Sequence, residues 1–302
     1  MALKIVRASD PITVERLNMV IYAQPGIGKT SLSFTAEAPL LLDFDNGSYR
    51  SANRRDAVII SNWSDVASIS AEDLAPFKTV IMDTAGRALD ALTADIIRSN
   101  PKHGRGGSLT LQGYGELKSR FISFLKLLNS FGKDVVLIAH MDEQRNGDDI
   151  IERLDVQGGS KGEIYKAADA MGRLVLKNGK RWLMFSPSDA AFGKNPGQLE
   201  PLEVPDMTDP AFNTFLATVF QRTKDRLNQM TEEQKEAIQE QQWFRDALPK
   251  VSDADGINGL LDRAKEGGAV CKRLLHTRAE ELHLHFDKAT NAYVETVKEA
   301  AE

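Results

Sequence analysis

The stretch LNMVIYAQPGIGKTSLSF, residues 17–34, decides the fold. Its first part, Leu17 to Ala23, is mostly apolar and β-prone, which predicts a short buried strand. Gly26 and Gly28 then mark a tight loop, and Thr30 to Ala36 reads as the start of a helix. A strand, a Gly-rich loop ending in Lys-Thr and a helix together place backbone N–H groups around a phosphate. The stretch therefore predicts a P-loop.

The P-loop pattern G-x-x-x-x-G-K-[ST] is matched at every fixed position except the first, where Ala23 stands in place of glycine. Alanine fits there if the backbone has a negative φ. We expect Lys29 to reach the β- and γ-phosphates of ATP and the Thr30 hydroxyl to ligate Mg²⁺. A chance strand, glycine turn and helix is the alternative. The residues predicted to bind the nucleotide are Gln24, Pro25, Gly26, Ile27, Gly28, Lys29, Thr30 and Ser31.

Two other apolar runs end in a side chain that can do chemistry. The run Thr79 to Met82 ends at Asp83. An aspartate in this position holds the Mg²⁺ shell, so Asp83 is a predicted metal ligand. Asp83 and Lys29 are both predicted catalytic residues. Val135 to Ala139 ends at His140, which could sense the γ-phosphate. A purely structural histidine is the alternative for His140.

The run Leu40 to Phe44 brings a third carboxylate to the same edge, because the carboxyl ends of parallel strands form the ligand crevice. Asp45 is our choice for polarising the water that attacks the γ-phosphate, and Asp43 is the second choice. The alternative is a solvated acid in the turn before Asn46-Gly47.

Strands that alternate with helices predict an α/β fold, with a mostly parallel sheet flanked by helices on both faces. After His140 the pattern changes, and we interpret the polar stretch Met141 to Lys161 as irregular. Arg173 to Leu176 and Trp182 to Phe185 are separated by Asn178-Gly179, which predicts an antiparallel hairpin. The proline-rich stretch Ser186 to Asp209 reads as an irregular connection.

The domain organisation follows from the helical character of the chain after Pro210. We expect an ATPase core over residues 1–220 and a helical C-terminal extension over residues 221–302. Within the extension, Trp243 to Val294 carries an α-hairpin pattern with a turn at Gly256.

Composition excludes several classes of protein. The 302 residues carry a net charge of −5, so a strongly basic DNA binder is not indicated. No apolar run reaches the roughly 18 residues of a membrane span, and the N-terminus lacks the features of a secretory signal. The single cysteine, Cys271, suits a reducing cytoplasm. His283 and His285 have no partners at ligand spacing, which argues against a zinc site.

Four segments together carry a resemblance to a known family: IYAQPGIGKTSL, LLLDFDNGS, FKTVIMDTAG and LQGYGELKSRFISFLKLLNSFGKDVVLIAH. Over residues 18–205 the chain resembles phage nucleotide-binding ATPases with a RecA/RadA-like core, several of which are single-strand-annealing or recombination proteins. In RecA-like proteins the second strand ends in Asp-x-Glu, and Asp45 matches the catalytic glutamate with a shorter side chain. His140 matches the polar sensor at the end of the fifth strand.

The resemblance also implies two DNA-facing loops and basic residues that act on a neighbouring subunit. The first loop is Gly-rich and the second holds more acids than bases, and ordinary solvated surface is the alternative for both. A charged hairpin tip is the alternative for the basic residues. The DNA-binding candidates are Lys102, His103 and Arg105 in the first loop and Arg145, Arg153 and Lys161 in the second, and the candidate trans fingers are Lys177, Lys180 and Arg181.

These features lead to the expectation of a Mg²⁺-ATP-hydrolysing recombination protein that anneals or pairs single-stranded DNA. It would assemble as a homo-oligomeric ring or filament, in the host cytoplasm if a phage encodes it, and its C-terminal helices could contact a single-strand-binding protein. One alternative is a nucleotide-regulated binding module with slow hydrolysis, which Asp45 in place of glutamate favours. A small-molecule kinase is disfavoured because no Arg-rich lid follows the core.

Overall fold

The computed structural model describes residues 13–146, 149–156, 161–288 and 290–295 of the chain. These residues form two compact units, one over Val14–Leu227 and one that begins at Asn228. The boundary lies within a single helix, α6 (Phe215–Ala247). In the described ranges no helix combines the length and the apolar character needed to cross a membrane.

The first unit is built on a central sheet with the strand order β11-β10-β9-β1-β7-β4-β2-β3. The six strands from β9 to β3 pair in parallel, and β10 and β11 extend the sheet antiparallel. The predicted α/β fold class, a mostly parallel sheet flanked by helices, is thereby confirmed. The bounds are β1 Asn18–Ala23, β2 Pro39–Asp43, β3 Ala57–Ile59, β4 Thr79–Asp83, β7 Asp134–Asn146, β9 Ala170–Lys177, β10 Lys180–Met184 and β11 Leu202–Val204.

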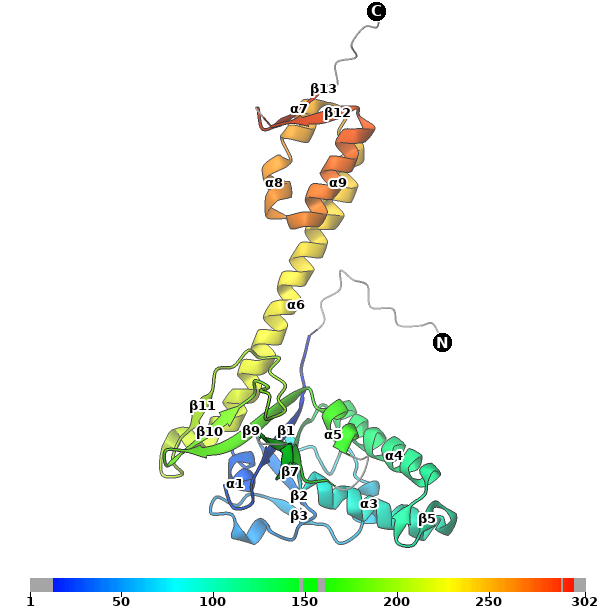
Figure 1. The fold of residues 1–302 in the computed structure, drawn as a ribbon, viewed down its shortest axis with the longest axis vertical. Helices are drawn as coiled ribbons and strands as arrows, with labels where there is room; N and C mark the ends of the chain where they lie inside the picture. Colours follow the sequence, from blue (N-terminus) through cyan, green and yellow to red (C-terminus); the bar gives the residue numbers. More distant parts are fainter. Residues whose placement is uncertain (1–12, 147–148, 157–160, 289, 296–302) are drawn as a thin grey trace, which may run out of the picture. The chain divides into compact units, whose positions relative to one another are not determined.

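Both faces of the sheet are covered, which explains why its central strands are apolar without alternation. Along β1, Val20 and Tyr22 pack into one hydrophobic core, and Met19 and Ile21 pack into the other. Helices α3 (Ala85–Ser99), α4 (Leu111–Ser130) and α5 (Lys161–Ala167) lie together beside the sheet in Figure 1 and contribute to the first core. The second core contains α1 (Lys29–Ser33) and the first turns of α6.

Side-chain caps define where the two long core helices begin. The hydroxyl of Thr84 accepts a hydrogen bond from the Arg87 backbone N–H at the start of α3, and that of Thr110 accepts one from Gly113 at the start of α4. The first cap fixes the chain directly after Asp83, so the end of β4 and the start of α3 form one defined corner at the carboxyl edge of the sheet.

The prediction of an irregular segment over Met141 to Lys161 is wrong. Strand β7 continues past His140 to Asn146 and pairs antiparallel with β8 (Asp149–Leu154), and α5 begins at Lys161. We name the paired part of β7 and β8, residues 141–146 and 149–154, the arm. Met141 and Leu154, which pair at the base of the arm, pack against the first core, whereas Asp142 and Glu143 are exposed, so the sequence of the arm shows no clear alternation.

The hairpin predicted around Asn178-Gly179 is confirmed. Lys177 pairs with Lys180, and both loop residues have positive φ values, 54° for Asn178 and 75° for Gly179, as a two-residue hairpin loop requires. The neighbouring Ser186 to Asp209 stretch was predicted to be irregular throughout, but Leu202–Val204 forms the edge strand β11. Three residues are too short to show a strand period.

In the described residues, the second unit contains the end of α6, a short 3-10 helix (Leu248–Lys250), three α-helices and a β-hairpin. Its core gathers Phe244, Leu248, Ile257, Cys271 and Leu275. The predicted α-hairpin is wrong in two respects, because Gly256 lies inside a helix and the last segment is a pair of strands. The bounds are α7 Ala254–Asn258, α8 Leu261–Glu266, α9 Gly268–Glu281, β12 Leu284–Asp287 and β13 Ala292–Glu295.

Candidate nucleotide-binding site

The loop between β1 and α1 has the backbone that a phosphate cradle needs. Gly26 and Gly28 have φ values of 78° and 101°, in the left-handed region that favours glycine. Ala23 is the last residue of β1, a strand conformation that alanine adopts freely, so the departure from the motif introduces no strain. The loop leads directly into α1 at Lys29, which directs backbone N–H groups toward a bound anion.

Lys29 is folded back across the loop. Its Nζ donates to the carbonyl oxygens of Ala23 at 3.1 Å and Gln24 at 2.9 Å, and it lies 3.4 Å from Nδ1 of His140. Burial lowers the pKa of Lys29 to about 8, against the opposing effect of the Asp83 and Asp45 charges. The amine is thus held at the mouth of the cradle by weak, neutral acceptors that a phosphate can replace.

Thr30 and Asp83 are in direct contact. The Thr30 hydroxyl donates to Oδ2 of Asp83 at 2.6 Å, which joins the start of α1 to the end of β4. Burial raises the pKa of Asp83 to about 6, the Thr30 hydrogen bond opposes this shift, and the charges of Asp43 and Asp45 add to it. The pair offers a hydroxyl and a carboxylate to a hard cation, so these residues fit Mg²⁺.

Magnesium at this position would neutralise phosphate charge as the nucleotide reacts. Among the described residues, no group of three or more His, Cys, Asp or Glu side chains could hold a metal without other ligands. A Mg²⁺ ion here would therefore rely on Thr30, Asp83, the phosphates of the nucleotide and water, which is the usual arrangement for this ion.

The two carboxylates after β2 have different positions. Asp43 is fully buried, and its two oxygens accept the backbone N–H groups of Gly47 at 3.1 Å and Ser48 at 2.8 Å, so it fixes the turn. Asp45 lines the pocket described below, and its side chain is 28% exposed. The Asp45 oxygens face two arginines, with Nη2 of Arg50 at 3.1 Å and Nε of Arg87 at 3.7 Å.

His140 lies beside the P-loop because β7 pairs with β1, with His140 opposite Ala23. Burial lowers the pKa of His140, and the positive charge of Lys29 lowers it further, which favours the neutral imidazole. The His140 carbonyl accepts the backbone N–H of Asp155 at 2.9 Å, at the base of the arm. His140 and the first strand of the arm therefore belong to the same strand, β7.

These groups surround one pocket of about 600 Å³. Gln24 and Ile27 were predicted to bind the nucleotide but do not line the pocket, and Nε2 of Gln24 instead donates to Oε1 of Glu143 on the arm at 2.6 Å. Met207 and the segment that follows Asp45 also line the pocket, although no local sequence pattern marks them. The lining residues are Pro25, Gly26, Gly28, Lys29, Thr30, Ser31, Asp45, Gly47, Arg50, Ser51, Ala52, Asp83, His140 and Met207.

Of the three candidate trans fingers, Arg181 contacts the P-loop of its own chain. A Cβ atom added to Gly28 would lie 3.1 Å from its Nη1, while its Nη2 donates to the Pro205 carbonyl at 3.1 Å. Lys180 pairs with Glu203 at 2.6 Å, and Lys177 is exposed. The action of these side chains on a neighbouring subunit stays a prediction.

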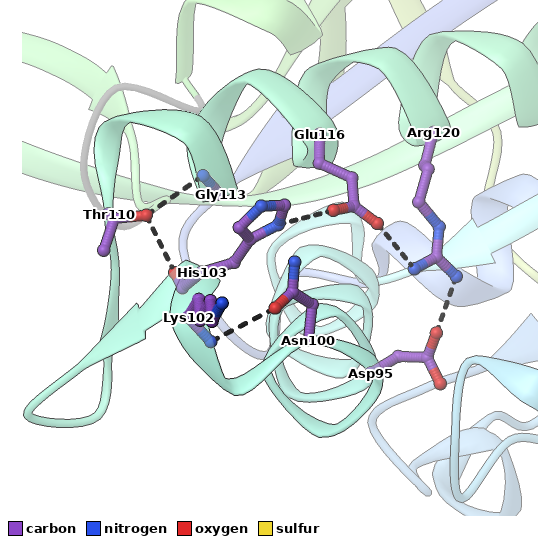
Figure 2. A network of polar contacts seen from close by, with 8 residues as sticks. All are labelled: Asp95, Asn100, Lys102, His103, Thr110, Gly113, Glu116 and Arg120. Atoms are coloured by element: carbon purple, nitrogen blue, oxygen red, sulfur yellow. Dashed lines mark hydrogen bonds and ion pairs between the residues drawn. The ribbon is translucent and has the colours of Figure 1, made fainter.

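The first predicted DNA-facing loop is a short turn and hairpin between α3 and α4. Figure 2 shows His103 joined to Glu116, Glu116 to Arg120 and Arg120 to Asp95, so the loop is fixed to α4, which is itself joined to α3. Nδ1 of His103 lies 2.7 Å from Oε2 of Glu116. The loop comprises η2 (Pro101–His103), β5 (Gly104–Arg105) and β6 (Ser108–Leu109), and the side chains of Lys102 and Arg105 are exposed.

The second predicted DNA-facing loop is the arm and the segment after it. Arg153 packs with its guanidinium 4.4 Å from the centre of the Phe192 ring, and its Nη1 donates to the Glu152 carbonyl at 3.1 Å. The side chains of Arg145 and Lys161 lie outside the described residues. Arg153 is therefore engaged in packing within its own chain.

A mostly parallel sheet with a P-loop after β1 and a Thr-Asp pair between α1 and β4 defines a P-loop NTPase. Residues 15–196 match the family model described as AAA domain. The chain belongs to this family and is a P-loop ATPase of the AAA type.

Solved structures show distant similarity. A KaiC-like protein from the hyperthermophilic archaeon Pyrococcus horikoshii OT3 is 12% identical, over 56% of this chain and 77% of that chain, with a TM-score of 0.33. An ATPase from the type III secretion system of pathogenic bacteria is 14% identical, over 53% of this chain and 52% of that chain, with a TM-score of 0.35. The match thus spans about half the length of that ATPase. No curated protein matches the chain.

Proposed function

We propose that the protein is a Mg²⁺-dependent ATPase that acts in recombination on single-stranded DNA, by annealing or strand pairing, and assembles as a ring or filament. The observation that carries the ATPase half is the 2.6 Å hydrogen bond between Thr30 and Asp83 at the mouth of the P-loop. It places the two expected Mg²⁺ ligands side by side, although they come from distant parts of the chain.

Different residues of the pocket have different roles in hydrolysis. The backbone N–H groups after Gly26 and the Lys29 amine bind the phosphates. Asp45 orients the attacking water and accepts its proton as the new bond to the γ-phosphorus forms and the bond to the β-γ bridging oxygen breaks. His140 lies next to Lys29, so a γ-phosphate bound by Lys29 changes the charge beside the imidazole.

The DNA half rests on the resemblance and on the exposed cations Lys102 and Arg105 at a loop that is fixed to α4. With a net charge of −5, DNA contact must come from such local groups. The test is ATP turnover with and without single-stranded DNA at low salt. We expect stimulation in the wild type and its loss in Lys102→Ala/Arg105→Ala, with exposed Lys126 changed to Ala as the control. Absence of both DNA binding and stimulation in the wild type would refute this half.

A nucleotide-regulated binding module with slow hydrolysis is the second candidate. The pairing of Asp45 with Arg50 and Arg87 favours it, because a short carboxylate engaged by two cations is less free to hold the attacking water. Tight ATP binding with negligible turnover, even with DNA present, would establish this alternative. Measurable turnover that depends on Asp45 would exclude it.

A further inference from the structure

The segment Gly47–Asn53, which the sequence analysis did not assign to the site, forms one wall of the pocket. It is fixed at both ends. Asp43 accepts the backbone N–H groups of Gly47 and Ser48, and Asn53 donates through Nδ2 to the Ser31 carbonyl at 2.9 Å. Ser51 adds a hydroxyl contact to Ser31 at 2.8 Å. The wall is thereby joined both to the strand before it and to the helix that follows the P-loop.

This wall presents one cation, Arg50. Its side chain is 61% exposed and folds back over its own turn, so that Nη2 lies 3.1 Å from Oδ2 of Asp45. The folded-back side chain of Arg50 passes Gly47, where an added Cβ atom would collide with the guanidinium. Since φ at Gly47 is −112°, alanine is sterically allowed in the backbone. An added Cβ would require the Arg50 guanidinium, at the far end of a flexible side chain, to shift.

We propose that Arg50 is a phosphate-contacting residue supplied in cis, which binds the terminal phosphates of the nucleotide together with Lys29 in the same pocket. This inference rests on the proposed ATP site. A guanidinium fits two phosphate oxygens at once and keeps its charge at any working pH. Asp45 holds it at the pocket, and the several negative charges of a triphosphate compete with that single carboxylate for it. The role is the one that the resemblance assigns to a neighbour's residues.

The direct test measures the affinity for ATP, ADP and AMP by titration calorimetry. Arg50→Ala should weaken ATP binding about tenfold and AMP binding little, because a charge-assisted hydrogen bond to the distal phosphates is lost. Arg50→Lys should recover part of the loss, and Gly47→Ala should reproduce it by displacing the guanidinium. Arg54→Ala, the same charge change at an exposed residue that does not line the pocket, is the matched control.

Equal ATP affinity in Arg50→Ala and wild type would overturn the inference, while failure of the wild type to bind ATP would refute the proposed function itself. Mixing separates cis from trans action. Lys29→Ala retains Arg50, and Arg50→Ala retains Lys29, so a residue acting in trans would restore turnover when the two are combined. We expect no restoration, and recovered turnover would overturn the cis assignment.

Discussion

The Thr30 hydroxyl donates to the Asp83 carboxylate across 2.6 Å, and burial raises the pKa of that carboxyl to about 6. Thr30 lies in the first turn of α1, directly after the P-loop, and Asp83 ends β4, which is separated from β1 by β7 in the sheet. The contact therefore joins the helix after the P-loop to the carboxylate at the end of β4. Burial of the Asp83 carboxylate has a cost in stability.

Asp83→Asn should stabilise the ligand-free fold and abolish Mg²⁺-dependent turnover. The folded-state pKa of about 6 exceeds the ordinary value of 3.8, so the folded protein retains a proton that the unfolded chain loses between these pH values. Stability must therefore fall as pH rises from about 4 to about 6, by roughly 1–3 kcal/mol. Denaturant unfolding at several pH values should show this slope in the wild type and its loss in the variant. An unchanged slope would contradict the assignment.

Lys29→Ala should abolish nucleotide binding or turnover, because the P-loop amine is lost. The pKa of about 8 adds a second expectation. Phosphate favours the charged amine, so ATP binding above about pH 8 should be accompanied by proton uptake, and affinity should decrease from pH 7 to pH 9. Calorimetry in buffers of different ionisation enthalpy measures the uptake. Lys29→Arg, which stays charged, serves as the control and should show no uptake at this residue.

Substitutions of Asp43 and Asp45 are expected to have different effects, the first on stability and the second on turnover. Asp45→Asn should reduce turnover at least about 100-fold with little change in melting temperature, because a group acting on the water is lost. Asp43→Ala should cost about 1–3 kcal/mol of stability, because two backbone N–H groups lose their acceptor in a buried site. Thermal denaturation and steady-state turnover of both variants separate these outcomes. If Asp43→Asn, not Asp45→Asn, removed turnover in a stable protein, the roles would have to be exchanged.

Arg181→Ala should weaken ATP binding in dilute, unassembled protein, whereas Lys177→Ala should not. The Arg181 guanidinium abuts the P-loop at Gly28 and lies 5.5 Å from the centre of the Phe212 ring, while Lys177 is exposed at the hairpin end. Binding curves at protein concentrations below assembly make the comparison. An effect of Lys177→Ala that appears only in turnover at high concentration would support a trans role for that lysine.

The central strands and the P-loop could be predicted because each leaves a dense local signal. β1 and β4 are buried on both faces and read as apolar runs, and the glycines and Lys29 mark the cradle. The arm could not be predicted, because its pairing is satisfied by backbone hydrogen bonds that any polar sequence can make. The pocket wall at Arg50 depends on long-range contacts to Ser31, which no local pattern contains. The choice between Asp43 and Asp45 needed their hydrogen-bond partners.

The continuity of strand β7 links the pocket mechanically to the arm. Its residues from Asp134 to Asn146 form one continuous ribbon, with His140 in the pocket wall and the paired arm starting at the next residue. No loop separates the imidazole from the arm, so there is no slack between them. The bond from Gln24 to Glu143 makes a second tie from the P-loop to the arm. A displacement of the phosphate-binding end of β7 is therefore transmitted along the strand to the arm.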